Sequence, residues 1–462
     1  MFTLVSHWYQ PVIRQRAQAI AQGEVHIDVA ALTAASQVPD DEKGGAIILD
    51  ISSSMTGIGL TNLKIAAKQA LEDLPDGTKV TIITFSGYSD FGSDGHAIFQ
   101  SLAQDTVLTP SSRIELAKEI DKLQAGGYTR FFEPTFSGIH WLSQLGEMAK
   151  VVILCTDGEP TVPFVNPGSW SKFFRDLGTT VIPQEEDNDL MLQLCAQLLG
   201  LGAPLFAYGM GTAYQEDILT AWVEAAGGES RLFHVTSGGA GLNAAMQQSI
   251  ARLAKAVAHK VEIAFVAAAG VEIVDIFAMV PAPRHVGNID PALAVDKVGM
   301  VNSAEGAPYQ VVFRFLGTPP LAQSVPVATI KVTYYVGTQQ FTEEFPLTID
   351  VTNDQDLVAS RQDDSVAVTL TKTQSLLGAD QALRDLTAAR TRGDQDAIDR
   401  ATAAFTRSKT MAAATNDPAL SALLSGMASG DPDIARDSLS RARSMHVDLD
   451  KLLDGLEAED DD

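Results

Sequence analysis

The stretch Ala46-Ile47-Ile48-Leu49-Asp50-Ile51-Ser52-Ser53-Ser54 joins a run of apolar residues to an aspartate and a cluster of serines. An unbroken apolar run of this length is typical of a strand that is buried on both faces, as in a parallel sheet. The Asp50 carboxylate and the Ser52 and Ser54 hydroxyls follow at alternate positions, which point the same way off an extended backbone. The stretch therefore predicts half a shell of hard oxygen ligands for a divalent cation.

Two later segments supply further oxygen donors. Gly126-Gly127-Tyr128-Thr129 places a hydroxyl after a flexible glycine pair. A second apolar run, residues 151–155, leads through Thr156 to Asp157-Gly158, which puts another carboxylate at the end of a strand. Because ligands of open α/β sheets bind outside the carboxyl ends of the strands, we expect Asp50 and Asp157 to share one face.

These three segments, in this order and spacing, resemble the metal-ion-dependent adhesion site (MIDAS) of von Willebrand factor type A (VWA) domains. The resemblance implies that Ser52 and Ser54 ligate Mg²⁺ or Mn²⁺ directly and that Thr129 does so directly or through water. It also implies that Asp50 and Asp157 act mostly through water and hydrogen bonds. One departure is the bulky Tyr128, where relatives usually carry a small residue, and it predicts a stiffer threonine loop.

The chemistry of such a site favours binding over catalysis. Mg²⁺ seeks six oxygen ligands, and neutral hydroxyls leave most of its charge uncompensated. We therefore expect a partner protein to complete the shell with an Asp or Glu carboxylate. We expect no enzymatic activity and assign no catalytic residue, since no general base stands out in the sequence.

Each motif also has a plain structural interpretation. Asp50 and the serines could cap the helix that the apolar spacing predicts from Leu60 onward, and Asp157-Gly158 could be an ordinary turn. An enzymatic alternative treats Asp50 as a phosphoryl-accepting nucleophile of the haloacid-dehalogenase type. That chemistry requires a second acid two residues on, where this chain has Ser52.

The segments around the motifs predict an α/β fold, a Rossmann-like VWA domain with a mainly parallel sheet. Short apolar runs alternate with stretches of helical spacing, which indicates a sheet with helices on both faces. The predicted strands are residues 46–49, 80–85, 151–155, 204–208 and 232–235.

The sequence pattern predicts two further domains after the α/β region, so that the whole chain divides into five segments. Period-two alternation after about residue 259 favours a β-sandwich, and the alternating residues 24–32 are expected to add a strand to it. Alanine-rich helical patterns separated by Gly-Asp turns predict a helical domain. The predicted boundaries are an N-terminal segment 1–43, a VWA domain 44–258, a β-sandwich 259–352, a helical domain 353–455 and an acidic tail 456–462.

Composition limits the classes of partner. The chain has 462 residues and a formal net charge of −25, which argues against nucleic acid or an anionic membrane surface as its main partner. We predict a cytoplasmic protein, because no apolar run would span a bilayer and the start lacks a signal-peptide pattern. The two cysteines, Cys155 and Cys195, are expected to be buried and unbridged.

The order of segments is similar to that of bacterial cytoplasmic VWA proteins of the calcium-activated-chloride-channel-like class. The resemblance implies a scaffold or adaptor that works beside an ATPase or kinase. The alternative that we keep open is a regulatory subunit of an AAA+ ATPase complex of the MoxR or chelatase type. The loops at residues 86–95 and 159–174, rich in aromatic residues, are the expected specificity elements.

Overall fold

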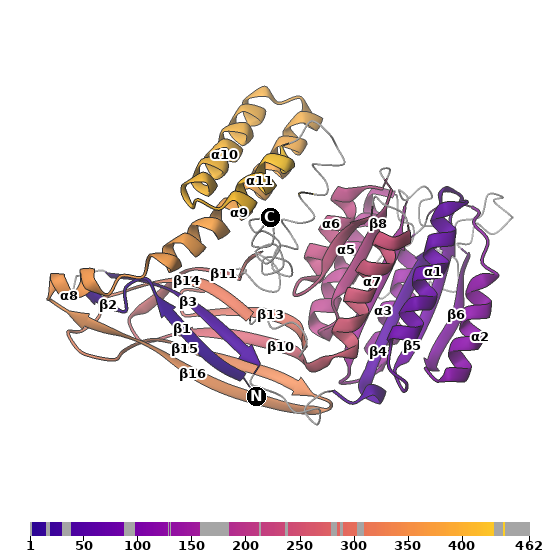
Figure 1. Cartoon of the computed structure of the whole chain (residues 1–462), viewed down its shortest axis with the longest axis horizontal. Coiled ribbons are helices and arrows are strands. Elements are labelled where there is room, and N and C mark those ends of the chain that lie inside the picture. Colours follow the sequence, from indigo (N-terminus) through magenta and orange to yellow (C-terminus); the bar gives the residue numbers. More distant parts are fainter. Residues whose placement is uncertain are drawn as a thin grey trace, which may run out of the picture.

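The computed structural model describes residues 2–14, 19–29, 38–86, 98–127, 129, 131–157, 184–211, 214–235, 239–278, 284–286, 290–302, 309–428 and 438. Three parts follow one another in space: a β-sandwich, an α/β part beside it and a group of helices that covers the sandwich and reaches toward the α/β part (Figure 1). The predicted acidic tail and both predicted specificity loops lie outside the described residues, apart from Ser86.

The central sheet of the α/β part has the strand order β6-β5-β4-β7-β8-β9. All neighbours are parallel except β5 and β6, which are antiparallel. The strands are β4 (Lys43–Asp50), β5 (Lys79–Ser86), β6 (Ile98–Val107), β7 (Ala149–Thr156), β8 (Leu205–Met210) and β9 (Arg231–Val235). The predicted mainly parallel sheet is confirmed.

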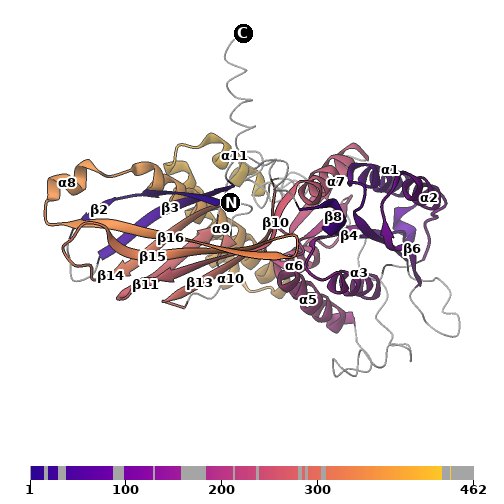
Figure 2. The ribbon, with the colours of Figure 1, turned by 90° about the horizontal axis from the view of Figure 1, so that it is seen from below.

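Helices cover both faces of this sheet, as Figure 2 shows. Ile47 and Leu49 of β4 belong to one buried core, whereas Ala46 and Ile48 belong to the core on the other face. This alternation explains why the strand is apolar throughout. The first core is closed by α1 (Ile58–Asp73), α2 (Pro110–Asp121) and α7 (Gly239–Ala254), and the second by α3 (Phe132–Gln144), α5 (Gln184–Leu201) and α6 (Glu216–Ala226).

The β-rich part consists of two five-stranded sheets, in the orders β1-β3-β14-β11-β12 and β13-β10-β15-β16-β2. Their inner faces share one apolar core, to which Val25 and Phe313 contribute from the first sheet and Phe265 and Val332 from the second. This arrangement is the β-sandwich that the alternating pattern predicts, and its neighbouring strands are antiparallel except for β16 and β2, which are parallel. The strands are β1 (Phe2–Trp8), β2 (Val12–Arg14), β3 (Ala19–Val29), β10 (Ala256–Ala267), β11 (Val271–Ala278), β12 (Arg284–His285), β13 (Leu293–Asn302), β14 (Tyr309–Gly317), β15 (Val325–Val336) and β16 (Gln339–Thr352).

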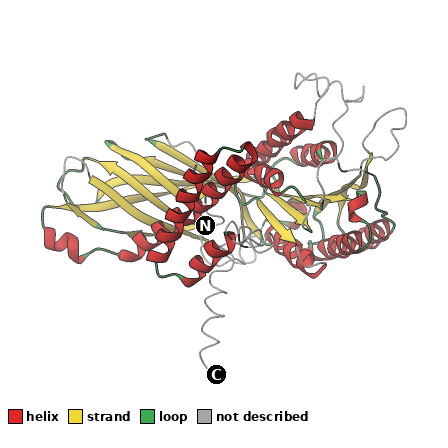
Figure 3. Cartoon of the chain, turned by 90° about the horizontal axis from the view of Figure 1, so that it is seen from above, coloured by secondary structure: helices red, strands yellow, loops and turns green. Residues whose placement is uncertain are grey.

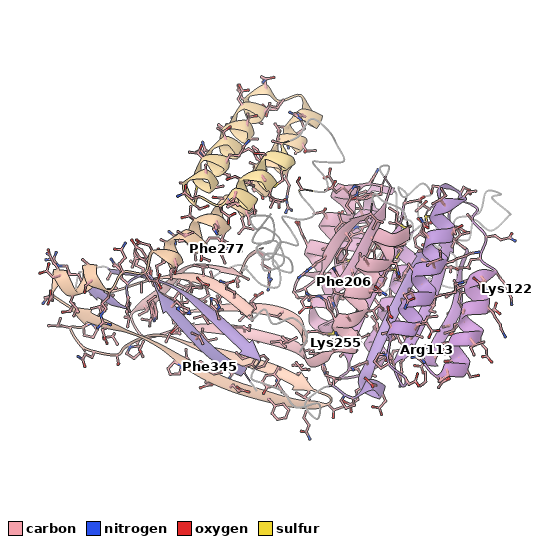
Figure 4. All side chains as sticks on the ribbon, viewed as in Figure 1. Arg113, Lys122, Phe206, Lys255, Phe277 and Phe345 are labelled. Atoms are coloured by element: carbon pink, nitrogen blue, oxygen red, sulfur yellow. The ribbon has the colours of Figure 1, made fainter. Side chains whose placement is uncertain are left out.

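The chain leaves the sandwich and returns to it at one place. β3 pairs with β14 along its length, so the N-terminal segment contributes strands to the sandwich before the α/β part begins. The backbone N–H of Val38 donates to the carbonyl of Ala256 at 2.9 Å, which joins the outgoing segment to the start of β10. Because β10 begins at Ala256, it extends across the predicted boundary between residues 258 and 259. Lys255, between α7 and β10, lies at this junction (Figure 4).

The C-terminal helices are α8 (Gln355–Ser360), α9 (Asp364–Arg392), α10 (Gln395–Ala414) and α11 (Pro418–Met427). An aspartate caps the N-terminus of each one, for example Asp394, whose carboxylate accepts from the Ala397 N–H at 3.0 Å. The long helix α9 crosses the strands of the sandwich (Figure 3), where Leu370 packs on Val312 and Phe277. Among the described residues, no helix combines the length and apolar character needed to cross a bilayer.

Candidate metal centre

The parallel pairing of β4 and β7 brings the first two motifs to one edge of the sheet. Leu49 of β4 is opposite Cys155 of β7, so Asp50 and Thr156 end neighbouring strands side by side. Asp157 follows directly. After Asp50 the chain turns through a short 3₁₀ segment, Ser53–Met55, before α1 begins at Ile58. The predicted carboxylates therefore share the edge at which ligands of such sheets bind.

Asp50 is fully buried, and both of its carboxylate oxygens accept hydrogen bonds. The Ser52 N–H donates to Oδ1 at 2.8 Å, and the Thr156 hydroxyl donates to Oδ2 at 2.6 Å. Burial raises the pKa of Asp50 to about 6, although these hydrogen bonds act in the opposite direction, and the nearby charge of Asp157 adds to the rise. Ionising the buried Asp50 carboxylate costs free energy unless a positive charge lies close to it.

Ser52, Ser54 and Asp157 form a chain of oxygen contacts. The hydroxyls of Ser52 and Ser54 are 2.9 Å apart, and the Ser54 hydroxyl donates to Asp157 Oδ1 at 2.7 Å. Ser52 is buried and Ser54 is exposed, so the chain extends from the protein interior to solvent. Partial burial raises the pKa of Asp157, while the bond from Ser54 lowers it.

The glycine pair ties the threonine segment to the serine turn. The Gly126 N–H donates to the Ile51 carbonyl at 2.9 Å, and the Gly127 carbonyl accepts from the Ser53 N–H at 3.1 Å. The Ser53 hydroxyl donates to the same carbonyl at 2.8 Å. Gly127 has φ +78°, a conformation that favours glycine. Thr129 follows two residues later and is buried, while Tyr128, with its predicted effect on this loop, lies outside the described residues.

The set of donors suits a hard cation. Asp50, Ser52, Ser54 and Asp157 offer only hydroxyl and carboxylate oxygens, which Mg²⁺ prefers. In the described part of the chain, no cluster of three or more His, Cys, Asp and Glu side chains could hold a metal ion. The candidate centre thus depends on its hydroxyl groups. The neighbouring Cys155 is fully buried in the apolar core, where burial raises the pKa of its thiol above the usual range.

Thr156 is a contributor that the sequence reasoning missed. Its hydroxyl holds Asp50 Oδ2, and Thr156 itself is fully buried. The available signal was a hydroxyl residue at the last position of an apolar strand, immediately before Asp157. The register of β4 against β7 places this residue beside Asp50 at the end of the sheet.

Comparisons with known proteins support the fold. No family model matches the sequence, and no curated protein matches it. Among solved structures, the chain is similar to a von Willebrand factor type A protein from Catenulispora acidiphila, with a TM-score of 0.70, 15% identity and 96% of both chains covered. It is also similar to the ArnB paralog VWA2 from Sulfolobus acidocaldarius, with a TM-score of 0.52 and 14% identity over 96% of this chain and 99% of that one.

A third similar structure is the human COPII-coat protein Sec24c, with a TM-score of 0.55 and 11% identity over 89% of this chain and 57% of that one. At these identities the likeness concerns the fold alone. The first two cover nearly the whole chain, so they include its β-rich and helical parts as well as its parallel sheet. The chain therefore has a VWA-like Rossmann fold, extended by antiparallel sheets and a helical C-terminal region.

Proposed function

We propose that the protein is a non-enzymatic, metal-dependent adaptor that captures an acidic residue of a partner protein. Asp50, Ser52, Ser54, Thr129 and Asp157 would hold Mg²⁺ or Mn²⁺ at the carboxyl ends of β4 and β7. The observation that carries this proposal is the connected set of oxygens from two strand ends, in which Ser54 bridges Ser52 and Asp157. A cation would replace these mutual contacts with metal–oxygen contacts.

The charge balance of the site supports an acidic ligand. Ser52, which is buried, and Ser54, which is exposed, would contribute hydroxyl oxygens that bring no negative charge. Asp50 is buried, and its two oxygens already accept hydrogen bonds from two donors. It is therefore suited to compensate part of the charge of a cation without contacting that cation directly. A bound dication supplies Lewis acidity, and a carboxylate from outside is the ligand that compensates its remaining charge.

The environment of Asp50 argues against its use as a nucleophile. A phosphoryl acceptor must present a free carboxylate oxygen to its substrate, because attack requires an aligned lone pair. Asp50 has no exposed surface, and each of its oxygens accepts a hydrogen bond of 2.8 Å or less. We therefore assign Asp50 to positioning and charge balance.

Calorimetric titration of the full chain with Mg²⁺ and Mn²⁺ tests the metal site. We expect saturable uptake by the wild type and its loss in Asp157→Ala, because this change removes the acceptor of the Ser54 hydroxyl. The matched control is Glu115→Gln, an exposed carboxylate on α2. Absence of uptake by folded wild-type protein would contradict the proposal, and so would equal losses in the two variants.

A capture experiment tests the partner class. Immobilised wild-type protein and Asp50→Ala would be compared in Mg²⁺ and in chelator, and the retained proteins identified by mass spectrometry. We expect a partner that is retained only by the wild type with metal, and whose retention is lost when its own acidic residues are changed to amides. Metal-dependent recovery of an AAA+ ATPase would instead favour the regulatory-subunit alternative. If the same proteins were retained in Mg²⁺ and in chelator, the adaptor mechanism would have no support.

A further inference from the structure

The junction between the α/β part and the sandwich has two covalent crossings at a single place. Val38 and Ala256 are hydrogen-bonded where the chain enters and leaves the α/β part. Just inside the α/β part, the Lys43 ammonium of β4 donates to the Ala254 carbonyl of α7 at 2.7 Å, which ties its first strand to its last helix. Two crossings that lie side by side define an axis about which two bodies can rotate. Their relative orientation must be fixed by contacts away from that axis.

One such contact is a close approach of backbones. Gly228, in the turn between α6 and β9, has φ +60°, and a β-carbon on it would lie 2.9 Å from the carbonyl oxygen of Val298 in β13. It would also lie 3.1 Å from the carbonyl oxygen of Lys297. A side chain at this position would therefore push the turn away from the sandwich. The next residue of the turn, Glu229, is buried.

Charged residues lie on both sides of this contact, and Arg252, Glu229 and Asp296 among them are buried. On the α/β side, Arg252 of α7 pairs with Glu229 at 2.5 Å, and each side chain is only 5% exposed. On the sandwich side, Arg284 of β12 donates to both oxygens of Asp296 in β13, at 2.5 and 3.3 Å. The Tyr309 hydroxyl of β14 also donates to Asp296.

The two pairs are electrically connected. Burial alone would lower the pKa of the Arg284 guanidinium, but the charges of Asp296, Tyr309 and Glu229 outweigh it and raise that pKa. Two groups of residues therefore flank the close approach at Gly228, namely Arg252 and Glu229 on the α/β side and Arg284, Asp296 and Tyr309 on the sandwich side. Together they are here called the junction network.

We propose that the close approach at Gly228, supported by the junction network on either side, locks the α/β part and the sandwich into one orientation. Rotation about the two crossings would draw this turn away from β13 and disturb the buried pairing of Glu229 with Arg252. A buried charge that loses a partner is strongly penalised, whereas an exposed one is not. The candidate metal face and the sandwich therefore move as one rigid body. This inference does not depend on metal binding at the other end of the sheet.

Hydrogen exchange of the full-length chain, resolved by residue, tests the lock in Glu229→Gln. We expect amide exchange at Val298, Gly299 and Met300 to become about tenfold faster or more, because these residues face the turn at Gly228. Exchange in the central strand β4 should stay unchanged. The matched control is Glu224→Gln, which removes a half-exposed glutamate of α6 that also pairs with an arginine, Arg384.

Unchanged exchange at Val298 to Met300 in folded Glu229→Gln would overturn the proposal, as would equal acceleration in the Glu224→Gln control. If Glu229→Gln does not fold, Arg284→Lys takes its place. Lysine keeps the charge but cannot donate the paired bonds that Arg284 makes to Asp296. We expect faster exchange at the same three amides in this variant. A folded Arg284→Lys protein with wild-type exchange there would also overturn the lock.

Discussion

The two ends of the parallel sheet carry opposite chemistry on the same two strands. At the carboxyl ends of β4 and β7, Asp50 and Asp157 gather with serine hydroxyls. At the amino ends, the buried ammonium groups of Lys43 and Lys150 come from neighbouring strand positions.

The two ends also differ in how their polar groups are satisfied. Lys43 has a carboxylate partner and a carbonyl partner, Asp40 at 2.6 Å and Ala254 at 2.7 Å. The serine hydroxyls at the other end contact each other and a carboxylate, an arrangement that a cation can take over. The amino end thus satisfies its polar groups within the protein, whereas the carboxyl end holds a set of oxygens that we propose a cation takes over.

The largest effect is expected from Lys43→Ala. This change removes a fully buried ammonium and leaves the Ala254 carbonyl without that donor. We expect the free energy of unfolding to fall by about 3 kcal/mol, as measured by urea denaturation. Metal uptake by the folded fraction should stay the same. If the Lys43→Ala protein lost metal affinity but kept its stability, the assignment of metal binding to the carboxyl end alone would be contradicted.

Lys150 gives the next largest effect, and its sign depends on pH. Burial and the charge of Lys260 lower the pKa of Lys150 to about 8 from its usual 10.5. The unfolded chain therefore holds this proton to higher pH, and the free energy of unfolding rises between pH 8 and 10.5. We expect Lys150→Met to stabilise the protein at pH 7 by about 2 kcal/mol and to abolish this alkaline rise. Denaturation curves at pH 7 and pH 10 would measure both effects, and parallel curves for the two proteins would contradict them.

Ser54→Ala tests the role of the serine hydroxyls at the carboxyl end of the sheet. The Ser54 side chain is exposed, so its hydroxyl contributes little to folding. We expect Mg²⁺ affinity in calorimetry to fall by more than about tenfold, with the metal-free urea midpoint unchanged. Loss of stability with intact affinity would assign this serine to structure.

The smallest effect is expected from Ser53→Ala, the neighbouring control. Ser53 donates its hydroxyl to the Gly127 carbonyl and is no proposed ligand. We expect a loss of about 0.5 kcal/mol in the free energy of unfolding and no change in metal affinity. A tenfold loss of affinity here would show that the loop at Gly127, rather than the ligands themselves, controls metal uptake.

Buried strands were predictable from sequence because they are apolar on both faces. β6 was missed because its polar residues, Gln100, Gln104 and Asp105, suit an edge strand that is half exposed. The helical domain was predicted from alanine-rich patterns, whereas α9 begins at Asp364, in a stretch with few alanines. Its first half is rich in Ser and Thr, which are weak helix formers. There Thr369 and Thr373 donate their hydroxyls to carbonyls four residues earlier, and packing on the sandwich supports the helix.

At the candidate centre, residue types indicated the segments but could not reveal the contacts between them. The approach of Ser54 to Asp157 spans 103 positions of sequence, and it depends on the register of β4 against β7. The support that Thr156 gives to Asp50 depends on the same register. Metal binding by Asp50, Ser52, Ser54, Thr129 and Asp157 stays a prediction for the titrations described above.

The closeness of Val38 and Ala256 has a consequence for protein engineering. The stretch between them, residues 39–255, has ends that meet through the 2.9 Å hydrogen bond from Val38 to Ala256. A stretch with adjoining ends can be cut from its host gene and grafted into a surface loop of an unrelated carrier, with little distortion of either. Such a graft of the α/β part would test the proposed cation uptake without the rest of the chain.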